Sequence, residues 1–251
     1  MEKIAVIPVR SGSKRLPRKN YKPFNSKNLA EIARDKCLSS GIFDKVVITS
    51  DDPFFEKLVN CNKVDFLLRN KNLADDYATT DIVIDFIFNQ YSSCESLLWV
   101  NSVSPLQSIQ DIKNCGLRLN NNDIDCVMAV NTLYQHCSMG NKPLNFNPKN
   151  AFEKTQDLEP IQRYIYSCMG WKKATYVKHR NEGFKGLFPG NIALVEASVL
   201  AGILIKYEED FILCSKIGDA LNFNDMIVKP NNKINNEQKQ NNILSDLLLN
   251  H

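Results

Sequence analysis

The sequence predicts an α/β protein built around a doubly wound, mostly parallel β-sheet. Short apolar runs rich in β-branched residues occur at 4–9, 45–49 and 64–68, and such runs are typical of strands buried on both faces of a parallel sheet. Segments with helical spacing separate these runs. Alternating strands and helices are joined by right-handed crossovers, so the strands lie parallel and helices cover both faces.

The composition indicates one α/β domain and argues against several classes of protein. A chain of 251 residues, of which 43% are apolar, can bury one sizeable core. The formal net charge of +3 is weak, which argues against a nucleic-acid-binding surface. The eight cysteines are scattered without a Cys-x-x-Cys pair, so we expect reduced thiols in a cytoplasmic protein and neither zinc nor disulfides. No run of 18 apolar residues and no signal-peptide pattern is present, so no membrane association is expected.

Helices and strands alternate after the first strand, and several of their ends carry capping residues. Residues 28–39 show helical spacing and are followed by Gly41, a C-cap candidate. The sequence Ser-Asp-Asp-Pro at 50–53 is typical of a helix start, with Pro in the first turn. The other expected elements are a helix at 81–90, a strand at 96–100, a helix at 109–119 and a strand at 125–130.

The second half of the chain contains a long stretch without periodicity. Residues 134–165 follow neither a helical nor a strand pattern and contain Pro143, Pro148 and Pro160. A stretch of this length in a compact domain indicates an excursion from the sheet or a lid. From residue 229 the chain is rich in Asn and Lys, which predicts a mobile C-terminal tail.

A basic loop at residues 10–22 follows the first strand. It contains six cations and no carboxylate, interspersed with Ser11, Gly12, Ser13 and Pro17, and Pro23 follows it. Open α/β sheets bind ligands at the carboxyl ends of their strands, and Lys and Arg side chains neutralise and orient phosphate oxygens. We therefore expect a polyphosphate here, although the loop matches neither the Gly-x-x-x-x-Gly-Lys-Ser/Thr loop nor a Gly-x-Gly-x-x-Gly turn. The alternative is a solvated basic loop or one that touches nucleic acid.

The run Ile-Pro-Val-Arg-Ser-Gly-Ser-Lys-Arg-Leu-Pro-Arg-Lys-Asn at residues 7–20 resembles the N-terminal signature of the acylneuraminate cytidylyltransferase family, which includes the CMP-sialic acid synthetases. The similarity continues at residues 47–52, 68–80 and 104–106. The resemblance implies a Rossmann-like nucleotidyltransferase fold and CMP transfer from CTP to an acidic sugar, with Mg²⁺ as cofactor. It also implies a homodimer, with residues 134–190 as a lid or dimerisation excursion.

The resemblance assigns roles to three groups of residues. Arg10, Lys14 and Lys19 are the expected catalytic residues, because positioning and charge neutralisation of the triphosphate carry nucleotidyl transfer. The expected nucleotide-binding residues are Pro8, Val9, Arg10, Ser11, Gly12, Ser13, Lys14, Lys19, Asn20, Arg69, Ala78 and Thr80. The expected sugar-binding residues are Asn101, Ser104, Gln156, Arg163 and Gly170. The segment 69–80 also fits an ordinary strand-to-helix connection with Thr79 or Thr80 as N-cap.

The sugar-binding positions depart from the family's pattern. Asn101 stands where relatives carry Gln, and it keeps the amide on a shorter side chain. Met169 and Gly170 stand in place of a sugar-facing Asn-Gly pair. A second group of cations would suit a sugar carboxylate or form solvated surface. This group consists of Arg163, Lys172, Lys173, His179 and Arg180.

The metal-binding positions depart from the pattern as well. Residues 203–211 align with a segment whose first two carboxylates hold Mg²⁺ in the family, and Leu204 and Lys206 occupy those positions here. Asp210 is then the expected metal ligand that remains. Two alternatives stay open for the function. One alternative to the expected enzyme is a non-catalytic nucleotide- or sugar-binding relative with a decayed metal site. The other is a cytidylyltransferase for a Kdo-type sugar or a phosphonate.

We accordingly expect a cytidylyltransferase-like domain at residues 1–228 and an Asn-rich tail at 229–251. The substrates are expected to be CTP and an acidic sugar, such as sialic acid or another nonulosonate, for the synthesis of cell-surface glycans. No nucleic-acid partner is expected, because the sequence lacks the aromatic stacking platform that basic nucleic-acid modules usually carry beside their charge.

Overall fold

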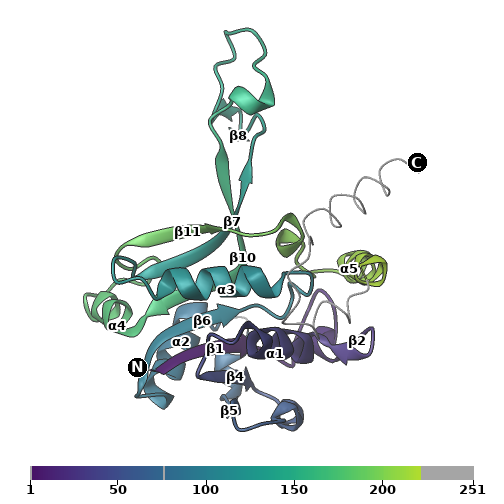
Figure 1. Ribbon diagram of the computed structural model, residues 1–251, viewed down its shortest axis with the longest axis vertical. Coiled ribbons are helices and arrows are strands. Elements are labelled where there is room, and N and C mark those ends of the chain that lie inside the picture. Colours follow the sequence, from purple (N-terminus) through teal and green to yellow (C-terminus); the bar gives the residue numbers. More distant parts are fainter. Residues whose placement is uncertain (1, 76, 222–251) are drawn as a thin grey trace.

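The computed structural model describes residues 2–75 and 77–221 and shows a three-layer α/β/α arrangement (Figure 1). The central sheet has the strand order β11-β7-β10-β6-β1-β4-β5 within this part of the chain. Its strands are β1 (Glu2–Pro8), β4 (Lys45–Ser50), β5 (Val64–Leu68), β6 (Cys94–Val100), β7 (Cys126–Leu133), β10 (Ile161–Lys172) and β11 (Ile192–Glu196). The helices are α1 (Leu29–Ser40), α2 (Thr80–Gln90), α3 (Ile109–Leu119), α4 (Lys173–Asn181) and α5 (Glu208–Ala220).

The predicted doubly wound, mostly parallel sheet is confirmed. β1 pairs in parallel with β4 and β6, β4 with β5, and β7 with β11. The chain builds the sheet outward from β1 through β4 to β5 and then crosses to β6 on the other side of β1. Ligands bind in open α/β sheets where the strand order reverses in this way, at the carboxyl ends of the strands. The switch point here lies between β1 and β6.

Two apolar clusters hold the layers together, one on each face of the sheet. One joins α1 and α3 to residues of β1, β4, β6 and β7, including Ile7, Ile48 and Val100. The other joins α2 and α4 to the opposite face and includes Trp99 and Trp171. Successive residues of a strand point to opposite faces, so Trp99 and Val100 lie in different clusters although they are neighbours in the sequence.

The capping expected for α1 is present at both ends. The Asn28 side chain accepts from the Glu31 N–H, and the Glu31 carboxylate accepts from the Asn28 N–H, which makes a reciprocal capping box. Gly41 ends the helix with φ 69°, a left-handed conformation that glycine adopts without a steric penalty. A cap of this kind contributes about 1 kcal/mol to helix stability.

One expected helix is shorter and tighter than the sequence predicts. The segment that starts at Pro53 forms a 3₁₀ helix, Pro53–Leu58, and not an α-helix. Asp52 caps it by accepting from the Phe54 N–H at 2.8 Å. Phe54 and Phe55 pack around the ring of Tyr21, with ring centroids 4.9 and 4.8 Å away. These aromatic contacts hold the segment in place. The helix stays short because 3₁₀ geometry rarely continues beyond a few residues.

β10 was not predicted, and its position corrects the boundaries of the expected excursion. The expected excursion spans residues 134–190, whereas residues 161–172 run through the middle of the sheet, antiparallel to both β6 and β7. The register of β10 shifts between Tyr164 and Met169. A bulge of this kind interrupts the alternation of inward and outward side chains, which hides the strand from a periodicity search.

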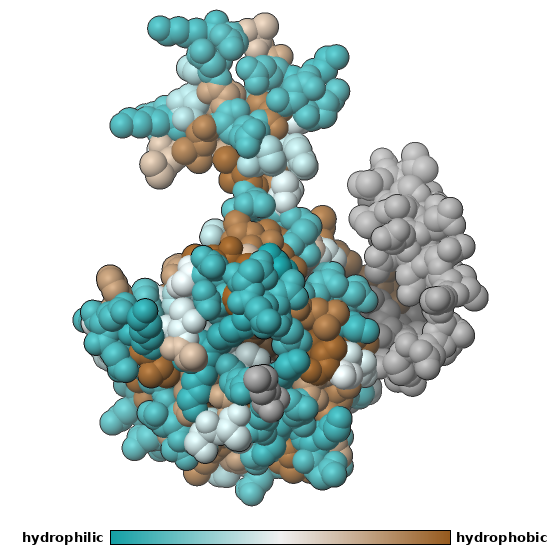
Figure 2. All heavy atoms as spheres, turned by 60° about the vertical axis from the view of Figure 1, so that its left-hand side comes forward, coloured by the Kyte–Doolittle hydropathy of each residue, from teal (hydrophilic) through white to brown (hydrophobic). Residues whose placement is uncertain are grey.

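Residues 134–160 leave the sheet between β7 and β10 and form an arm that stands clear of the body (Figures 1 and 2). The arm carries the hairpin of β8 (Ser138–Met139) and β9 (Lys142–Pro143) and the 3₁₀ turn Thr155–Asp157. Three aromatic rings pack together in the arm. The ring centroid of His136 lies 4.2 Å from that of Phe152 and 5.0 Å from that of Phe146. Figure 2 shows hydrophobic as well as hydrophilic side chains on its surface.

The expected C-terminal tail at 229–251 lies outside the described residues. Among the helices that the structure describes, none has the length and apolar character needed to cross a bilayer.

Candidate active site

A pocket of about 480 Å³ opens at the switch point, above the carboxyl ends of β1 and β6. Its volume lies in the range of small-molecule sites, about 300 to 1,000 Å³. One part of its wall comes from the basic loop, one from the segment before α2 and one from the loop after β6. The lining residues are Pro8, Arg10, Ser13, Lys14, Arg15, Lys19, Asn20, Arg69, Leu73, Ala74, Asp75, Ala78, Thr80, Val83, Trp99, Asn101, Ser102 and Val103.

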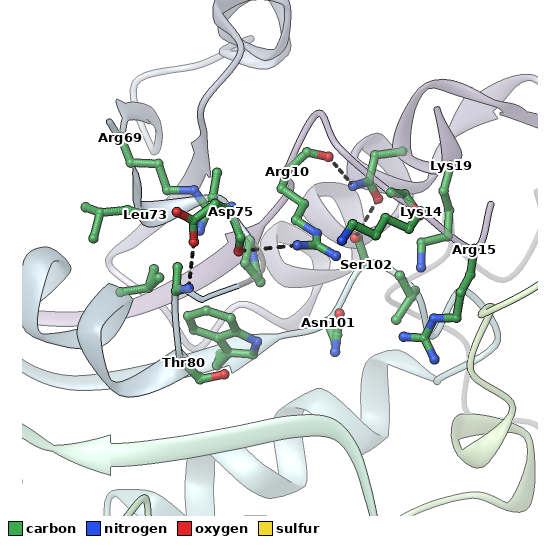
Figure 3. A pocket seen from close by; sticks show the side chains of 18 residues that line it. Arg10, Lys14, Arg15, Lys19, Arg69, Leu73, Asp75, Thr80, Asn101 and Ser102 are labelled. Carbon is green, nitrogen blue, oxygen red and sulfur yellow. Dashed lines mark hydrogen bonds between the residues drawn. The ribbon is translucent and has the colours of Figure 1, made fainter. Parts of the chain in front are cut away.

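Four cations of the basic loop gather at one end of this pocket: Arg10, Lys14, Arg15 and Lys19 (Figure 3). Asn20 holds the loop in place, because its amide donates to the Arg10 carbonyl at 3.1 Å. The same side chain accepts from the Ser102 hydroxyl at 3.2 Å. The contact between Asn20 and Ser102 ties the loop after β1 to the loop after β6, so the cationic end of the pocket is fixed by both strands.

Lys19 is partly buried among the other cations of the basic loop. Its ammonium donates to the Ile205 carbonyl at 2.9 Å, which connects the basic loop to the segment before α5. Burial, followed by the positive charges of Arg15 and Arg10, lowers the pKa of Lys19 to about 8. A bound anion would offset both the desolvation and the repulsion between these cations, so this end of the pocket favours phosphate.

Three of the expected nucleotide-binding residues support the loop from outside the pocket. Ser11 donates its N–H to Asp51 Oδ1 at 2.8 Å and its hydroxyl to Asp51 Oδ2. Val9 is fully buried, and its N–H donates to the Thr49 carbonyl at 2.9 Å. Gly12 does not line the pocket. These residues shape the turn, while their neighbours supply the side chains that face the ligand space.

The opposite end of the pocket is formed by Arg69 and by apolar side chains. Arg69 is 6% exposed, and burial lowers its pKa to about 10, although the nearby Asp51 carboxylate acts in the other direction. Its Nε has no hydrogen-bond partner among the described residues. Trp99 and Val83 line the same space. A buried guanidinium with an unmatched donor beside an apolar wall suits a planar group with hydrogen-bond acceptors, such as a nucleobase.

The segment between Arg69 and α2 is both a connection and a pocket wall. Asp75 Oδ1 accepts from the N–H groups of Tyr77 and Ala78, both at 2.8 Å, and so fixes the turn. The Asp75 carbonyl accepts from Arg10 at 3.5 Å across the pocket (Figure 3). Thr79 occupies the N-cap position of α2 without a side-chain hydrogen bond. The two interpretations of residues 69–80 are therefore compatible.

Of the expected sugar-binding residues, Asn101 lines the pocket. Its backbone N–H donates to the Ser167 carbonyl at 2.9 Å, and its amide lies 3.5 Å from the Tyr166 carbonyl. Ser104 is buried behind the loop, where its hydroxyl donates to the Ala201 carbonyl at 2.7 Å. Arg163 donates to Asn131 Oδ1 at 3.0 Å and does not line the pocket.

Gly170 and Gln156 lie elsewhere in the fold. Gly170 is in the middle of β10, where an added Cβ would approach the side chains of Leu119, Leu98 and Val127 to 2.8–2.9 Å. Its lack of a side chain serves core packing, which corrects the expected sugar contact. Gln156 is exposed on the arm and does not line the pocket.

The second group of cations is also dispersed. Lys172 donates to the Asn121 carbonyl, and Lys173 donates to three carbonyls at the end of α2 and just after it. Arg180 bridges Asp81 at 2.8 Å and Asp85 at 2.7 Å. The ring of His179 stacks on Phe184 at 4.7 Å. These side chains fasten α4 and the end of β10 to their neighbours, so they do not form a shared anion site.

The described residues do not fit a metal ion held by the protein. Among them, no group of three or more His, Cys, Asp and Glu side chains is placed to bind one. Asp210 Oδ2 accepts from the N–H groups of Lys206 and Tyr207, both at 2.8 Å, and thereby caps α5. These hydrogen bonds, led by that from Tyr207, lower the pKa of Asp210. Asp210 is therefore a helix cap in the structure, and its expected role as a metal ligand stays a prediction.

Several lining residues were not predicted. Arg15 belongs to the basic loop, and Ser102 and Val103 follow Asn101, so their positions in the sequence give a local signal. Predicting Trp99 would have required knowledge of which face of β6 borders the pocket. The other unpredicted lining residues are Leu73, Ala74, Asp75 and Val83.

Comparison with known proteins supports the same chemistry. Residues 4–178 match the cytidylyltransferase family. The chain is 29% identical over 169 residues to the pseudaminic acid cytidylyltransferase of Campylobacter jejuni, an alignment that covers 63% of this chain and 73% of that protein. It is 28% identical over 190 residues to an N-acylneuraminate cytidylyltransferase of Streptococcus agalactiae, covering 72% of this chain and 46% of that protein.

The fold is also similar to that of solved structures. A CMP:2-keto-3-deoxy-manno-octonic acid synthetase complexed with CTP has a TM-score of 0.62 at 12% identity, covering 87% of this chain and 99% of that one. At this identity the likeness shows the fold alone. Because the sequence match covers residues 4–178, well over half of the 251, this chain belongs to the cytidylyltransferase family.

Proposed function

We propose that this protein transfers CMP from CTP to an acidic sugar and releases pyrophosphate. The observation that carries the proposal is the uneven distribution of charge along the pocket. Arg10, Lys14 and Lys19 lie at one end and Arg69 lies at the other, and the apolar ring of Trp99 also lines the pocket. A nucleoside triphosphate has a matching distribution, since its negative charge is concentrated at one end and its planar base lies at the other.

In this proposal the basic loop positions and neutralises the triphosphate. Arg10, Lys14 and Lys19 contact phosphate oxygens through charge-assisted hydrogen bonds. Asn20 keeps the loop in register with the strand end through its contacts with the Arg10 carbonyl and Ser102. Arg69, with Ala78 and Thr80 beside it, holds the cytidine portion.

The reaction requires one bond to form and one to break at the α-phosphorus. A hydroxyl oxygen of the sugar attacks, the bond to the bridging oxygen of the β-phosphate breaks, and pyrophosphate leaves while the hydroxyl proton passes to solvent. Negative charge develops on the departing pyrophosphate, and the cationic end of the pocket stabilises it. Such stabilisation by fixed charges is often the largest single contribution to catalysis.

The acceptor class is taken from the relatives. The curated relatives are named for pseudaminic acid, N-acylneuraminate and 3-deoxy-manno-octulosonate, all of which are acidic sugars. We propose a nonulosonate as the acceptor and keep the octulosonate as the alternative. Asn101 is the lining residue proposed to contact it.

Mg²⁺ and a homodimer belong to the proposal as expectations from the family. The donor set around Asp210 does not support a metal held by protein carboxylates, so no step is assigned to one. The arm at 134–160 supports the dimer, because it extends away from the body and carries the exposed apolar side chains Met139, Leu144 and Phe152. Covering such side chains with a second copy would remove apolar surface from water.

A second candidate is a binding protein that kept the pocket and lost turnover. Leu204 and Lys206 at the positions of the family's metal-binding carboxylates favour it, together with the capping role of Asp210. The intact cationic end argues against it, because mutually repelling charges cost stability when no anion binds.

The test is pyrophosphate release, measured with each of the four NTPs against N-acetylneuraminate, pseudaminic acid and 3-deoxy-manno-octulosonate. We expect turnover with CTP and at least one of these sugars. Comparable rates with ATP or UTP would reject the nucleotide assignment. Calorimetry that detects CTP binding without turnover of any sugar would favour the binding protein instead.

A further inference from the structure

Lys36 is a buried lysine of α1 that does not line the pocket. It is 2% exposed, and its side chain reaches from α1 to the loop that leads into α3, which packs beside α1 on the same face of the sheet (Figure 1). Its ammonium donates to the carbonyls of Pro105 and Gln107, to the latter at 2.6 Å. Both of these residues are buried, so water cannot readily take the place of the ammonium as their donor.

The two carbonyls belong to the loop between β6 and α3, residues 101–108, which we call the β6–α3 loop. Successive turns run back along it towards the pocket. The Gln107 N–H donates to the Ser104 carbonyl at 3.2 Å, and the Ser104 N–H donates to the Asn101 carbonyl at 3.1 Å. Asn101 and Ser102 line the pocket. A chain of hydrogen bonds therefore connects the carbonyls that Lys36 holds to the residue that we propose to contact the acceptor.

Lys36 fastens this loop to the core of the protein. Cys37, its neighbour in α1, belongs to the apolar cluster that packs α1 and α3 on the sheet. Another contact of the β6–α3 loop is with the segment before α5, where the Ile205 N–H donates to the Val103 carbonyl at 2.8 Å. The Ile205 carbonyl in turn accepts from Lys19 of the basic loop. The β6–α3 loop thus connects the cationic end of the pocket with α1, and Lys36 makes the connection to α1.

A cation is costly at this buried position. Burial lowers the pKa of Lys36 to about 7, although the Asp111 carboxylate and the Cys37 thiol act in the other direction. Asp111 also accepts from the N–H and the hydroxyl of Ser198, at 2.8 and 2.7 Å. A methionine would fill nearly the same space without the desolvation of a charge. Packing alone therefore does not account for a lysine here, whereas its hydrogen bonds to the loop do.

We propose that Lys36 is a positioning residue that fixes the β6–α3 loop, so that Asn101 keeps its place in the pocket. This inference rests on the proposed function and adds to it a residue that touches neither substrate. When the two carbonyls lose their donor, the turns that lead to Asn101 loosen, and the acceptor meets a less ordered wall. The basic loop is still held by the hydrogen bond from Asn20 to the Arg10 carbonyl. Loss of Lys36 should therefore affect the acceptor more than CTP.

The kinetic test uses Lys36→Met, which keeps the length of the side chain and removes its N–H groups. Rates are measured with whichever of N-acetylneuraminate, pseudaminic acid and 3-deoxy-manno-octulosonate the wild type turns over. The KM for this sugar should rise about tenfold at saturating CTP, while the Kd of CTP, measured by calorimetry, should change less than about threefold. Lys36→Leu is a second apolar replacement that should show the same split, so the test does not depend on the folding of one variant.

Lys173→Met is the matched control. Lys173 also donates to backbone carbonyls, those of Phe88, Tyr91 and Ser92, but none of these residues lines the pocket. The control should lower Tm by about 2 to 8 °C and leave both the KM for the sugar and the Kd of CTP unchanged. An equal rise in KM in the control, or an equal loss of sugar and CTP binding in Lys36→Met, would indicate a general loss of structure and would overturn the assignment.

Hydrogen-exchange NMR of the ligand-free protein separates this inference from the proposed function. The backbone N–H groups of Asn101, Ser104 and Gln107 are all hydrogen-bonded, and they should exchange roughly tenfold faster in Lys36→Met, whereas those of β1 and β4 should keep their wild-type rates. If no sugar turns over but this pattern is observed, the proposed function fails and the role of Lys36 in shaping the loop stands. Wild-type exchange rates in the loop would refute that role even where turnover is found.

Discussion

Replacing Lys19 by methionine removes one charge from the cationic end of the pocket and keeps most of the side chain's apolar length. The ammonium has three N–H groups, one of which donates to the Ile205 carbonyl at 2.9 Å. Up to two are then available for phosphate oxygens, and charge-assisted bonds contribute about 1.5 to 3 kcal/mol each. Because solvent reaches the site and weakens these bonds, we expect a loss of about 2 to 4 kcal/mol of transition-state stabilisation, which is less than their sum. This corresponds to a roughly 30- to 1,000-fold lower kcat/KM.

The assay is pyrophosphate release with CTP varied at a saturating concentration of whichever sugar is turned over. Lys22→Met is the matched control, because Lys22 belongs to the same loop, pairs with Glu208 at 2.6 Å and does not line the pocket. We expect a change of less than threefold in this control, since exposed ion pairs contribute about 0 to 1 kcal/mol. Arg10→Ala should lower kcat/KM in the same range as Lys19→Met. An unchanged kcat/KM in both pocket variants, or an equal loss in the Lys22 control, would refute the role of the loop.

Three further predictions follow from individual contacts. Because the pKa of Lys19 is lowered to about 8, the group is partly neutral above that pH, and phosphate binding should raise its pKa; CTP binding at pH 8.5 should therefore take up protons and weaken as the pH rises further. Calorimetry in two buffers of different ionisation enthalpy measures this uptake, which Lys19→Met should abolish. Gly170→Ala should lower Tm by about 2 to 12 °C, because overpacking a core costs about 1 to 3 kcal/mol, while an unchanged KM for CTP would separate Gly170 from the site. Lys206 stands where relatives carry a metal-binding carboxylate, and an ammonium there can contact phosphate and replace part of the metal's charge. Lys206→Asp should therefore lower the rate and make it depend more strongly on added Mg²⁺ in a Mg²⁺ titration; equal Mg²⁺ dependence in both proteins would show that Lys206 takes no part in phosphate binding.

The sequence alone determines those features whose causes are contiguous. α3 begins and ends where its apolar spacing predicts, and α1 carries the expected cap at Gly41. The basic loop is identified because its cations and small residues follow directly after a buried strand. Nine of the twelve expected nucleotide-binding residues line the pocket, and all of them come from two short segments, 8–20 and 69–80. Within such a segment, the spacing along the chain largely decides which side chains meet.

The tertiary structure decides everything that depends on partners distant in the sequence. β10 enters the sheet between β6 and β7, and its bulge removes the alternation by which a strand is recognised. A cation's role likewise depends on its neighbours: Arg180 is held by Asp81 and Asp85 of α2, almost a hundred residues away in the chain. Gly170 has the same residue type as a ligand-approach glycine, but three core side chains surround it. Strand order and register set these contacts, and no local pattern encodes them.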